Sequence, residues 1–159
     1  MPVNKVYLDT NVFIYTVEQV VPWAARAVEV LKAIDNGEIS AATSELSLAE
    51  ALVRPFQLGN QQAIRAYRGI FQTRAWLRVV PIERGILVDA ARLCGACLRG
   101  TENARAKLPD AIHAATALVE GCELILTNDR RFQAFPEINK LYLRDFLEPQ
   151  DLSSEESLS

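Results

Sequence analysis

The sequence predicts an α/β fold, a three-layer α/β/α sandwich around a central, mostly parallel sheet of four to five strands. Short apolar segments rich in β-favouring residues alternate with longer amphipathic segments, the order typical of parallel strands joined by helices. Two of these strand segments have an acidic residue at their carboxyl end, Asp9 after the first and Asp129 two residues after the other. The carboxyl ends of parallel strands open on one side of a sheet, where such folds bind ligands.

Length and composition predict a single domain at residues 1–147. A chain of 159 residues, half of them hydrophobic and 23% charged, has the composition of an ordinary soluble globular domain. Residues 148–159 are acidic and contain no aromatic residue, so we expect a disordered tail. No apolar run approaches the roughly 18 residues of a membrane span, and Lys5 and Asp9 interrupt the only candidate signal-peptide core. We therefore expect a cytoplasmic protein with no membrane partner.

The net charge of −3 is unevenly distributed along the chain. The last twelve residues hold four of the 20 acidic residues and none of the 17 basic ones, so residues 1–147 carry 17 basic against 16 acidic residues. If a metal occupied four of those acids, the remaining surface would be net basic. The charge is therefore compatible with an RNA partner.

Capping residues, glycine and proline set the predicted elements of the first half. Thr10 and Asn11 are good N-cap residues after the first strand, Pro22 opens a helix, and Gly37 supplies its stop. In chain order, these elements are a strand at 6–8, a short helix from 12, a helix at 22–34, a weak strand at 39–43, a helix from 44 that Pro55 ends, and a helix at 60–76.

In the second half, apolar periodicity alternates with polar breaks. Gly121 is the expected stop of the helix that precedes the most strongly apolar strand. The elements are a strand at 77–82, a long helix at 83–98, a polar, basic loop at 99–107, a helix at 108–119, a buried-type strand at 123–127 and a last short strand at 140–143.

The cysteines raise the question of a zinc site. Cys94 and Cys97 match a C-x-x-C pair, and with Cys122 and His113 they would supply four zinc ligands by count. However, the pair lies inside the predicted helix at 83–98, and an odd number of cysteines without a secretion signal argues against disulfides. We therefore expect cysteines of the core.

Three acidic residues each have a simple local explanation. Asp9 could cap the helix that follows it, and Asp129 could be a turn residue after a strand. Asp110 follows Pro109 in the first turn of a helix, where the helix dipole favours an acid. Together with Glu50 they make four acids at the ends of predicted elements, which a shared site explains better than separate local roles do.

Glu50 also has a local alternative. In the segment Ser47-Leu-Ala-Glu50 it could complete a capping box, but only if the helix begins at Ser47. If Ser44 is the cap, Glu50 lies in the second turn and is free to point elsewhere.

Four segments, in this order, resemble the motifs of PIN domains. The resemblance is strongest to the VapC-type toxins of bacterial toxin–antitoxin pairs and covers about residues 4–147. It implies a Mg²⁺- or Mn²⁺-dependent endoribonuclease that leaves 5′-phosphate and 3′-hydroxyl ends, forms a homodimer and is held inactive by an antitoxin segment in the acidic groove. The segments are Asp9-Thr10-Asn11-Val12, Leu48-Ala49-Glu50-Ala51-Leu52, Leu108-Pro109-Asp110 continuing through Ala117, and Leu126-Thr127-Asn128-Asp129.

Carried over residue by residue, the resemblance makes Asp9, Glu50, Asp110 and Asp129 the catalytic, metal-binding quartet. Closely packed carboxylates repel one another unless a cation or a raised pKa lets them coexist. Hard oxygen ligands in a chain with one histidine suit Mg²⁺ or Mn²⁺ rather than zinc or copper. We expect Asp9 to be the central, bridging ligand. Asp110 and Asp129 complete the ligand set, and Glu50 binds metal or orients the attacking water.

Five neighbours of the quartet are further candidates. Asn11 and Thr127 are expected to hydrogen-bond to the ligands. His113, three residues after Asp110, is either a packed residue or a group close to the metal or the phosphate. Arg130 and Arg131 either bind RNA phosphate or are merely solvated. They stand where some members of the superfamily carry a further acid, which puts a second metal in doubt.

Other functions remain open beside the toxin. One is a PIN-fold nuclease of RNA processing without an antitoxin, and another is a non-catalytic PIN module that binds RNA or protein. The four acids argue against the binding module, which does not need them. A flavodoxin-like phosphoacceptor, with Asp9 phosphorylated, fits less well. Such proteins typically carry the acceptor aspartate after a central strand and a lysine late in the chain, and Lys140, at the start of the last predicted strand, does not match that lysine well. A metal-independent ribonuclease is disfavoured, because its mechanism usually requires a separate general acid and general base, and the chain has only one histidine to serve as either.

Overall fold

The computed structural model describes residues 3–100 and 106–146. The predicted tail at 148–159 and part of the predicted loop at 99–107 lie outside these ranges. Five strands form one sheet in the order β3-β2-β1-β4-β5, and all four neighbouring pairs are parallel. The predicted α/β class and its parallel sheet are confirmed. The strands are β1 (Lys5–Leu8), β2 (Ser40–Ser44), β3 (Leu77–Val80), β4 (Leu124–Thr127) and β5 (Asn139–Tyr142).

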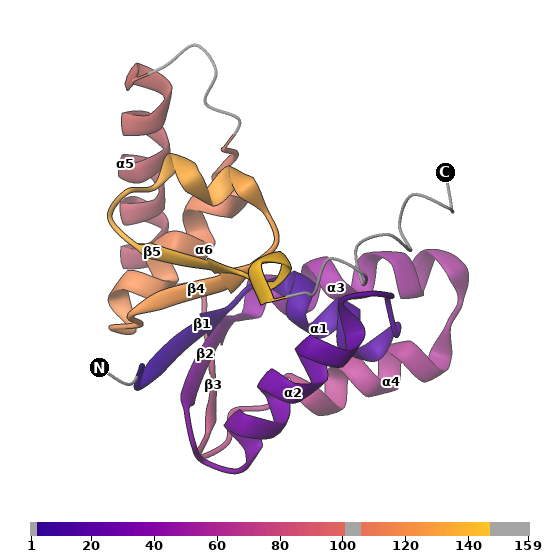
Figure 1. The fold of residues 1–159 in the computed structure, drawn as a ribbon. Helices are drawn as coiled ribbons and strands as arrows, with labels where there is room; N and C mark the ends of the chain where they lie inside the picture. Colours follow the sequence, from indigo (N-terminus) through magenta and orange to yellow (C-terminus); the bar gives the residue numbers. More distant parts are fainter. Residues whose placement is uncertain (1–2, 101–105, 147–159) are drawn as a thin grey trace.

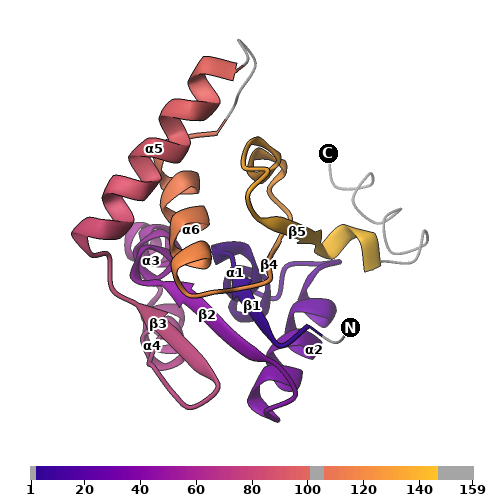
Figure 2. The same ribbon diagram turned by 90° about the vertical axis from the view of Figure 1, so that its left-hand side faces the viewer.

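Helices cover the sheet on both faces, as Figures 1 and 2 show. One group lies on one side, a second pair on the other, and two short 3₁₀ helices flank β5. The first group is α1 (Thr10–Val17), α2 (Ala24–Asp35), α3 (Glu45–Leu58) and α4 (Gln61–Ile70). The second is α5 (Arg84–Gly100) and α6 (Leu108–Val119), and the 3₁₀ helices are η1 (Arg130–Ala134) and η2 (Leu143–Phe146).

The strand β1 separates two hydrophobic cores. Successive side chains of a strand point to opposite faces, so Val6 and Leu8 join the core beneath α1–α4, while Tyr7 joins the core beneath α5 and α6. All three are buried. Because β1 is central and covered on both faces, its carboxyl end is fixed in position, and Asp9 stands directly on that end.

Two predicted helix ends are wrong. Pro55 does not end α3, because it lies in the last turn and the helix continues to Leu58, where Gly59 adopts a left-handed conformation with φ of 65°. The helix predicted at 60–76 ends at Ile70. The next residue, Phe71, turns into the core and packs against Phe13, with ring centroids 4.4 Å apart.

Gly59 and Gly95 allow a paired test of this helix end. Gly59→Ala is expected to cost about 1–2 kcal/mol, because an L-residue is strained at positive φ. Gly95→Ala, on the exposed surface of α5 with open space around its Cα, is expected to stabilise by about 0.5–1 kcal/mol. Urea unfolding of both variants measures the difference. Equal effects of the two changes would contradict the left-handed cap.

No helix within the described residues is both long and apolar enough to cross a membrane.

Candidate active site

Asp9 is fixed at the carboxyl end of the central strand. Its backbone N–H donates to the carbonyl of Leu126 (3.1 Å), which ties the end of β1 to β4. The side chain is buried and accepts from Thr10 N at Oδ1 (2.8 Å) and from Thr127 Oγ1 at Oδ2 (2.6 Å). The local capping role of Asp9 is therefore real, but it engages only one of its two oxygens.

Thr127 connects two members of the quartet. Its hydroxyl donates to Asp9 Oδ2 and accepts from the backbone N–H of Asp129 (2.8 Å), and the residue is fully buried at the end of β4. The Thr-x-Asp spacing thus places one hydroxyl between two acids, which agrees with the expected hydrogen-bonding role of Thr127. Asn11 lies half-buried in the first turn of α1, and among the described residues it makes no hydrogen bond to the quartet.

Glu50 is not a capping residue. Ser44 caps α3 by accepting from Leu46 N (3.1 Å), so the capping-box alternative for Glu50 is excluded. Glu50 Oε1 instead accepts from Thr10 Oγ1 (2.9 Å) and lies 2.5 Å from His113 Nε2. Thr10 therefore bridges Asp9 and Glu50, a role that the sequence did not indicate.

His113 is both packed and part of the site. It is 1% exposed on α6, and its two ring nitrogens contact Glu50 Oε1 and, at 2.7 Å, the hydroxyl of Tyr7. Because an ionised carboxylate can only accept, Nε2 carries the proton of the bond to Glu50. The contact with Tyr7 was missed, because a tyrosine in an apolar strand run reads simply as a core residue.

Asp110 and Asp129, the other two acids, both face the guanidinium of Arg131. Asp110 is buried at the start of α6 and accepts from the backbone N–H of Lys107 (2.8 Å), the expected first-turn role. Asp129 caps η1 and holds the guanidinium of Arg131, with Nη2 to Oδ2 at 2.5 Å and Nε to Oδ2 at 2.8 Å. Arg131 Nε is also 3.7 Å from Asp110 Oδ2. One network of short contacts thus joins all four acids.

The sequence pattern of the PIN domain family matches residues 6–138 of this chain. The chain belongs to the PIN domain family. The match includes all four acids, and the parallel sheet agrees with the PIN-like fold expected from the sequence. No curated protein matches the chain in sequence.

Solved structures with a similar fold include toxin–antitoxin proteins. VapBC from Salmonella typhimurium, bound to DNA, has a TM-score of 0.67 and 18% identity, covering 88% of this chain and 98% of that one. VapBC2 from Rickettsia felis, bound to a promoter DNA fragment, has a TM-score of 0.65 and 17% identity, covering 87% and 98%. VapC20 from Mycobacterium tuberculosis, a sarcin–ricin loop cleaving toxin, has a TM-score of 0.63 and 17% identity, covering 84% and 98%. At this identity the likeness concerns the fold alone.

The acids of this PIN domain fall into two electrostatic classes. Burial raises the pKa of Asp9, and the charge of Glu50 adds to the effect; burial likewise raises the pKa of Asp110, with a contribution from Asp129. Burial would also raise the pKa of Glu50, but the hydrogen bond and charge of His113 hold it below its usual value. Arg131 does the same for the pKa of Asp129. In Asp9 and Asp110, burial thus outweighs the opposing charges of His113 and Arg131, respectively.

The donor chemistry fits a hard divalent cation. The quartet offers carboxylate oxygens only, and its two buried members, Asp9 and Asp110, have raised pKa values that a nearby cation would lower. In the arrangement of residues 3–100 and 106–146, however, no three His, Cys, Asp or Glu side chains are grouped so as to hold a metal ion. Cys94 and Cys97 lie half-buried on α5, as expected for cysteines that pack against the core.

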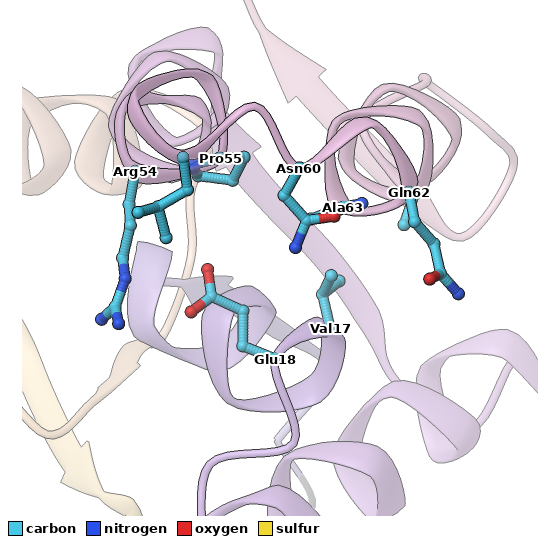
Figure 3. A pocket seen from close by; sticks show the side chains of 9 residues that line it. Val17, Glu18, Arg54, Pro55, Asn60, Gln62 and Ala63 are labelled. Atoms are coloured by element: carbon cyan, nitrogen blue, oxygen red, sulfur yellow. Dashed lines mark hydrogen bonds between the residues drawn. The ribbon is translucent and has the colours of Figure 1, made fainter.

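A separate hollow of about 430 Å³ lies where α1, α3 and α4 meet (Figure 3). Glu18, at the end of α1, accepts from the hydroxyl of Tyr67 (3.0 Å) at its border. On the neighbouring surface of α3, Val53, Phe56 and Leu58 are more than 60% exposed. We call these three exposed apolar side chains the apolar patch of α3. The hollow is lined by Val17, Glu18, Arg54, Pro55, Leu58, Asn60, Gln62, Ala63 and Ala66.

Proposed function

We propose that this PIN domain is a Mg²⁺- or Mn²⁺-dependent endoribonuclease, which hydrolyses RNA phosphodiester bonds. The observation that carries the proposal is the joining of Asp9, Glu50, Asp110 and Asp129 into one network at the carboxyl edge of a parallel sheet. Capping and turn formation account for Asp9, Asp110 and Asp129 singly, but they account neither for Glu50 nor for four acids in one place. PIN family membership supports the same reaction class.

In this proposal the quartet holds the cation, and the other residues position the reacting groups. When bound, a divalent cation neutralises the charge of the scissile phosphate and lowers the pKa of a bound water. Thr127 and Thr10 fix the rotamers of Asp9 and Glu50 through their hydroxyl groups. The Glu50 side chain is 40% exposed, and its second oxygen is proposed to orient the attacking water. Arg130 and Arg131, both exposed, are proposed to contact RNA phosphates.

Metal removal tests the proposal directly. With a fluorescent mixed-sequence RNA, we expect cleavage in Mg²⁺ or Mn²⁺, none in EDTA, and a loss of at least about 10²-fold in Asp110→Asn. Asp89→Asn, which removes an exposed acid that pairs with Arg92 on α5, is the charge-matched control. Mn²⁺ is also expected to raise the midpoint of thermal unfolding of the parent, because a ligand that binds only the folded state stabilises it. Cleavage that survives EDTA would overturn the metal-dependent mechanism.

We further propose that the nuclease is a toxin with a protein antitoxin. The names of the structural neighbours VapBC and VapBC2 are those of toxin–antitoxin pairs, and the apolar patch at Val53, Phe56 and Leu58 offers a surface for a partner. A short open reading frame beside this one, whose product copurifies and suppresses cleavage, is the expected result. Release of suppression by Phe56→Asp would place the partner on the patch.

We also propose that the protein forms a homodimer and is located in the cytoplasm. Light scattering after gel filtration of the parent tests the dimer, and a mass of 17.7 kDa would identify a monomer instead.

A further inference from the structure

Arg131 places a positive charge against two of the four acids. Its Nε and Nη2 form a paired contact with both oxygens of Asp129, and Nε also faces Asp110 Oδ2 at 3.7 Å. The carboxylates are largely covered, with 18% and 8% of their side chains exposed, whereas 41% of the Arg131 side chain is exposed. The neighbouring Arg130 is exposed and makes no ion pair to the quartet within the described residues.

We propose that Arg131 is a built-in counter-cation, which holds Asp110 and Asp129 in the metal-free protein, leaves them when a divalent cation binds, and then binds the scissile phosphate. The inference rests on the proposed nuclease function for its last step. Its first step concerns only the carboxylates and their charge.

The occupied oxygens require this exchange. Asp129 Oδ1 accepts from the backbone N–H and Nε of Arg131, and Oδ2 accepts from Nε and Nη2, so both oxygens already have cationic or N–H partners. Asp110 Oδ2 accepts from Lys107 N and faces the same guanidinium. A metal ion and the guanidinium compete for Asp129, because four N–H contacts already occupy its two oxygens and the two cations repel at contact distance. Asp129 therefore becomes a full ligand only when the guanidinium moves away, and the same movement removes the cation that faces Asp110 Oδ2.

The side chain of Arg131 is able to move without its backbone. The backbone N–H is tied to Asp129 Oδ1 at 2.9 Å, and the next residue, Phe132, is 1% exposed and packs against His113 and Phe135. The guanidinium, by contrast, is at the surface, and its partners are the acids that the metal would take. A planar guanidinium fork binds phosphate oxygens in the same paired geometry as carboxylate oxygens. The fixed backbone keeps the released guanidinium beside the site.

Mn²⁺ titration of the metal-free protein tests the first step. In Arg131→Gln, we expect Mn²⁺ to bind about threefold to tenfold more tightly than in the parent by calorimetry, because the competing cation is gone. Arg131→Lys, which keeps the charge but loses the fork, should lie between the two. Arg92→Gln, which removes an equally charged side chain from an exposed pair on α5, is the control for net charge. Weaker or unchanged Mn²⁺ affinity in Arg131→Gln, or no Mn²⁺ binding in either protein, overturns the proposal.

RNA cleavage tests the second step. At saturating Mn²⁺, Arg131→Gln is expected to cleave about 10- to 100-fold more slowly, although it binds the metal more tightly. Tighter Mn²⁺ binding with unchanged cleavage would overturn the phosphate-binding step. If the parent cleaves no RNA while Mn²⁺ affinity still rises in Arg131→Gln, the nuclease proposal fails and the counter-cation stands. If Asp110→Asn loses cleavage while Arg131→Gln changes neither property, the nuclease stands and the counter-cation fails.

Discussion

Asp9→Asn is expected to lower RNA cleavage by at least about 10³-fold and at the same time to stabilise the metal-free protein. The activity falls because a neutral amide replaces the charged carboxylate at the centre of the proposed metal site. The stability rises because Asp9 is 5% exposed and burial raises its pKa, so at neutral pH the fold holds a carboxylate at a cost. A gain of about 1 kcal/mol would raise the unfolding midpoint by roughly 2–4 °C.

The opposite signs make this prediction specific. A substitution that merely damaged the fold would lower both quantities. Unfolding in EDTA and cleavage in Mg²⁺ are measured on the same preparation, with Thr127→Val as a second variant. Thr127→Val keeps the Asp9 charge but removes the hydroxyl that donates to it, so it should lower both stability and activity. A large fall in the unfolding midpoint of Asp9→Asn would contradict the idea that Asp9 is held at a cost.

His113→Ala is expected to lower cleavage by about 10- to 100-fold and to cost about 2–4 kcal/mol of stability. The stability falls because the change leaves a cavity in the core and removes the partner of the Tyr7 hydroxyl. The activity falls because Glu50 loses the contact that fixes Oε1. A positioning role predicts that kcat falls more than KM rises, since the RNA itself does not touch a buried imidazole.

Two variants separate positioning from packing. His113→Gln keeps a side-chain amide that can donate to Glu50, and it should recover part of the activity. Tyr7→Phe removes only the hydroxyl at 2.7 Å from Nδ1, and it should cost about 1 kcal/mol with a smaller loss of activity. Cleavage by His113→Ala at the parental rate would show that the imidazole serves the core alone.

The fold and the placement of the quartet could be predicted because both depend on short-range patterns. The strand segments, the capping residues and the glycines at 37 and 121, which have positive φ in the structure, mark most elements to within a few residues. The ends of α3 and α4 were predicted wrongly because tertiary packing, not local sequence, determines where these helices end. Phe71 turns into the core beside Phe13, and Pro55 is tolerated in the last turn of α3.

The partners of the acids could not be predicted, because they depend on side chains far apart in the sequence. Tyr7 and His113 are 106 residues apart, and Glu50 and His113 are 63 apart. The ion pair of Arg131 with Asp129 is local, yet only a phosphate contact and the commoner solvated state were weighed for this arginine from the sequence, not a contact with the four acids. The side-chain rotamer of Arg131, rather than its distance from Asp129 in the sequence, determines whether the two side chains meet.

The central position of β1 determines when the site can assemble during synthesis and folding of the chain. β1 pairs with β2, the next strand in the chain, and also with β4. The residue of β4 that pairs with Tyr7 is Ile125, more than a hundred residues later. Because β4 lies at residues 124–127, most of the chain must be synthesised before β4 can pair with β1. Closing so long a loop is also slow compared with local pairing. Until then Asp9 and Glu50 are present, but Thr127 and Asp129 have not joined them. A nascent or truncated chain therefore carries the first acids without the assembled site, and only the completed fold brings all four acids together.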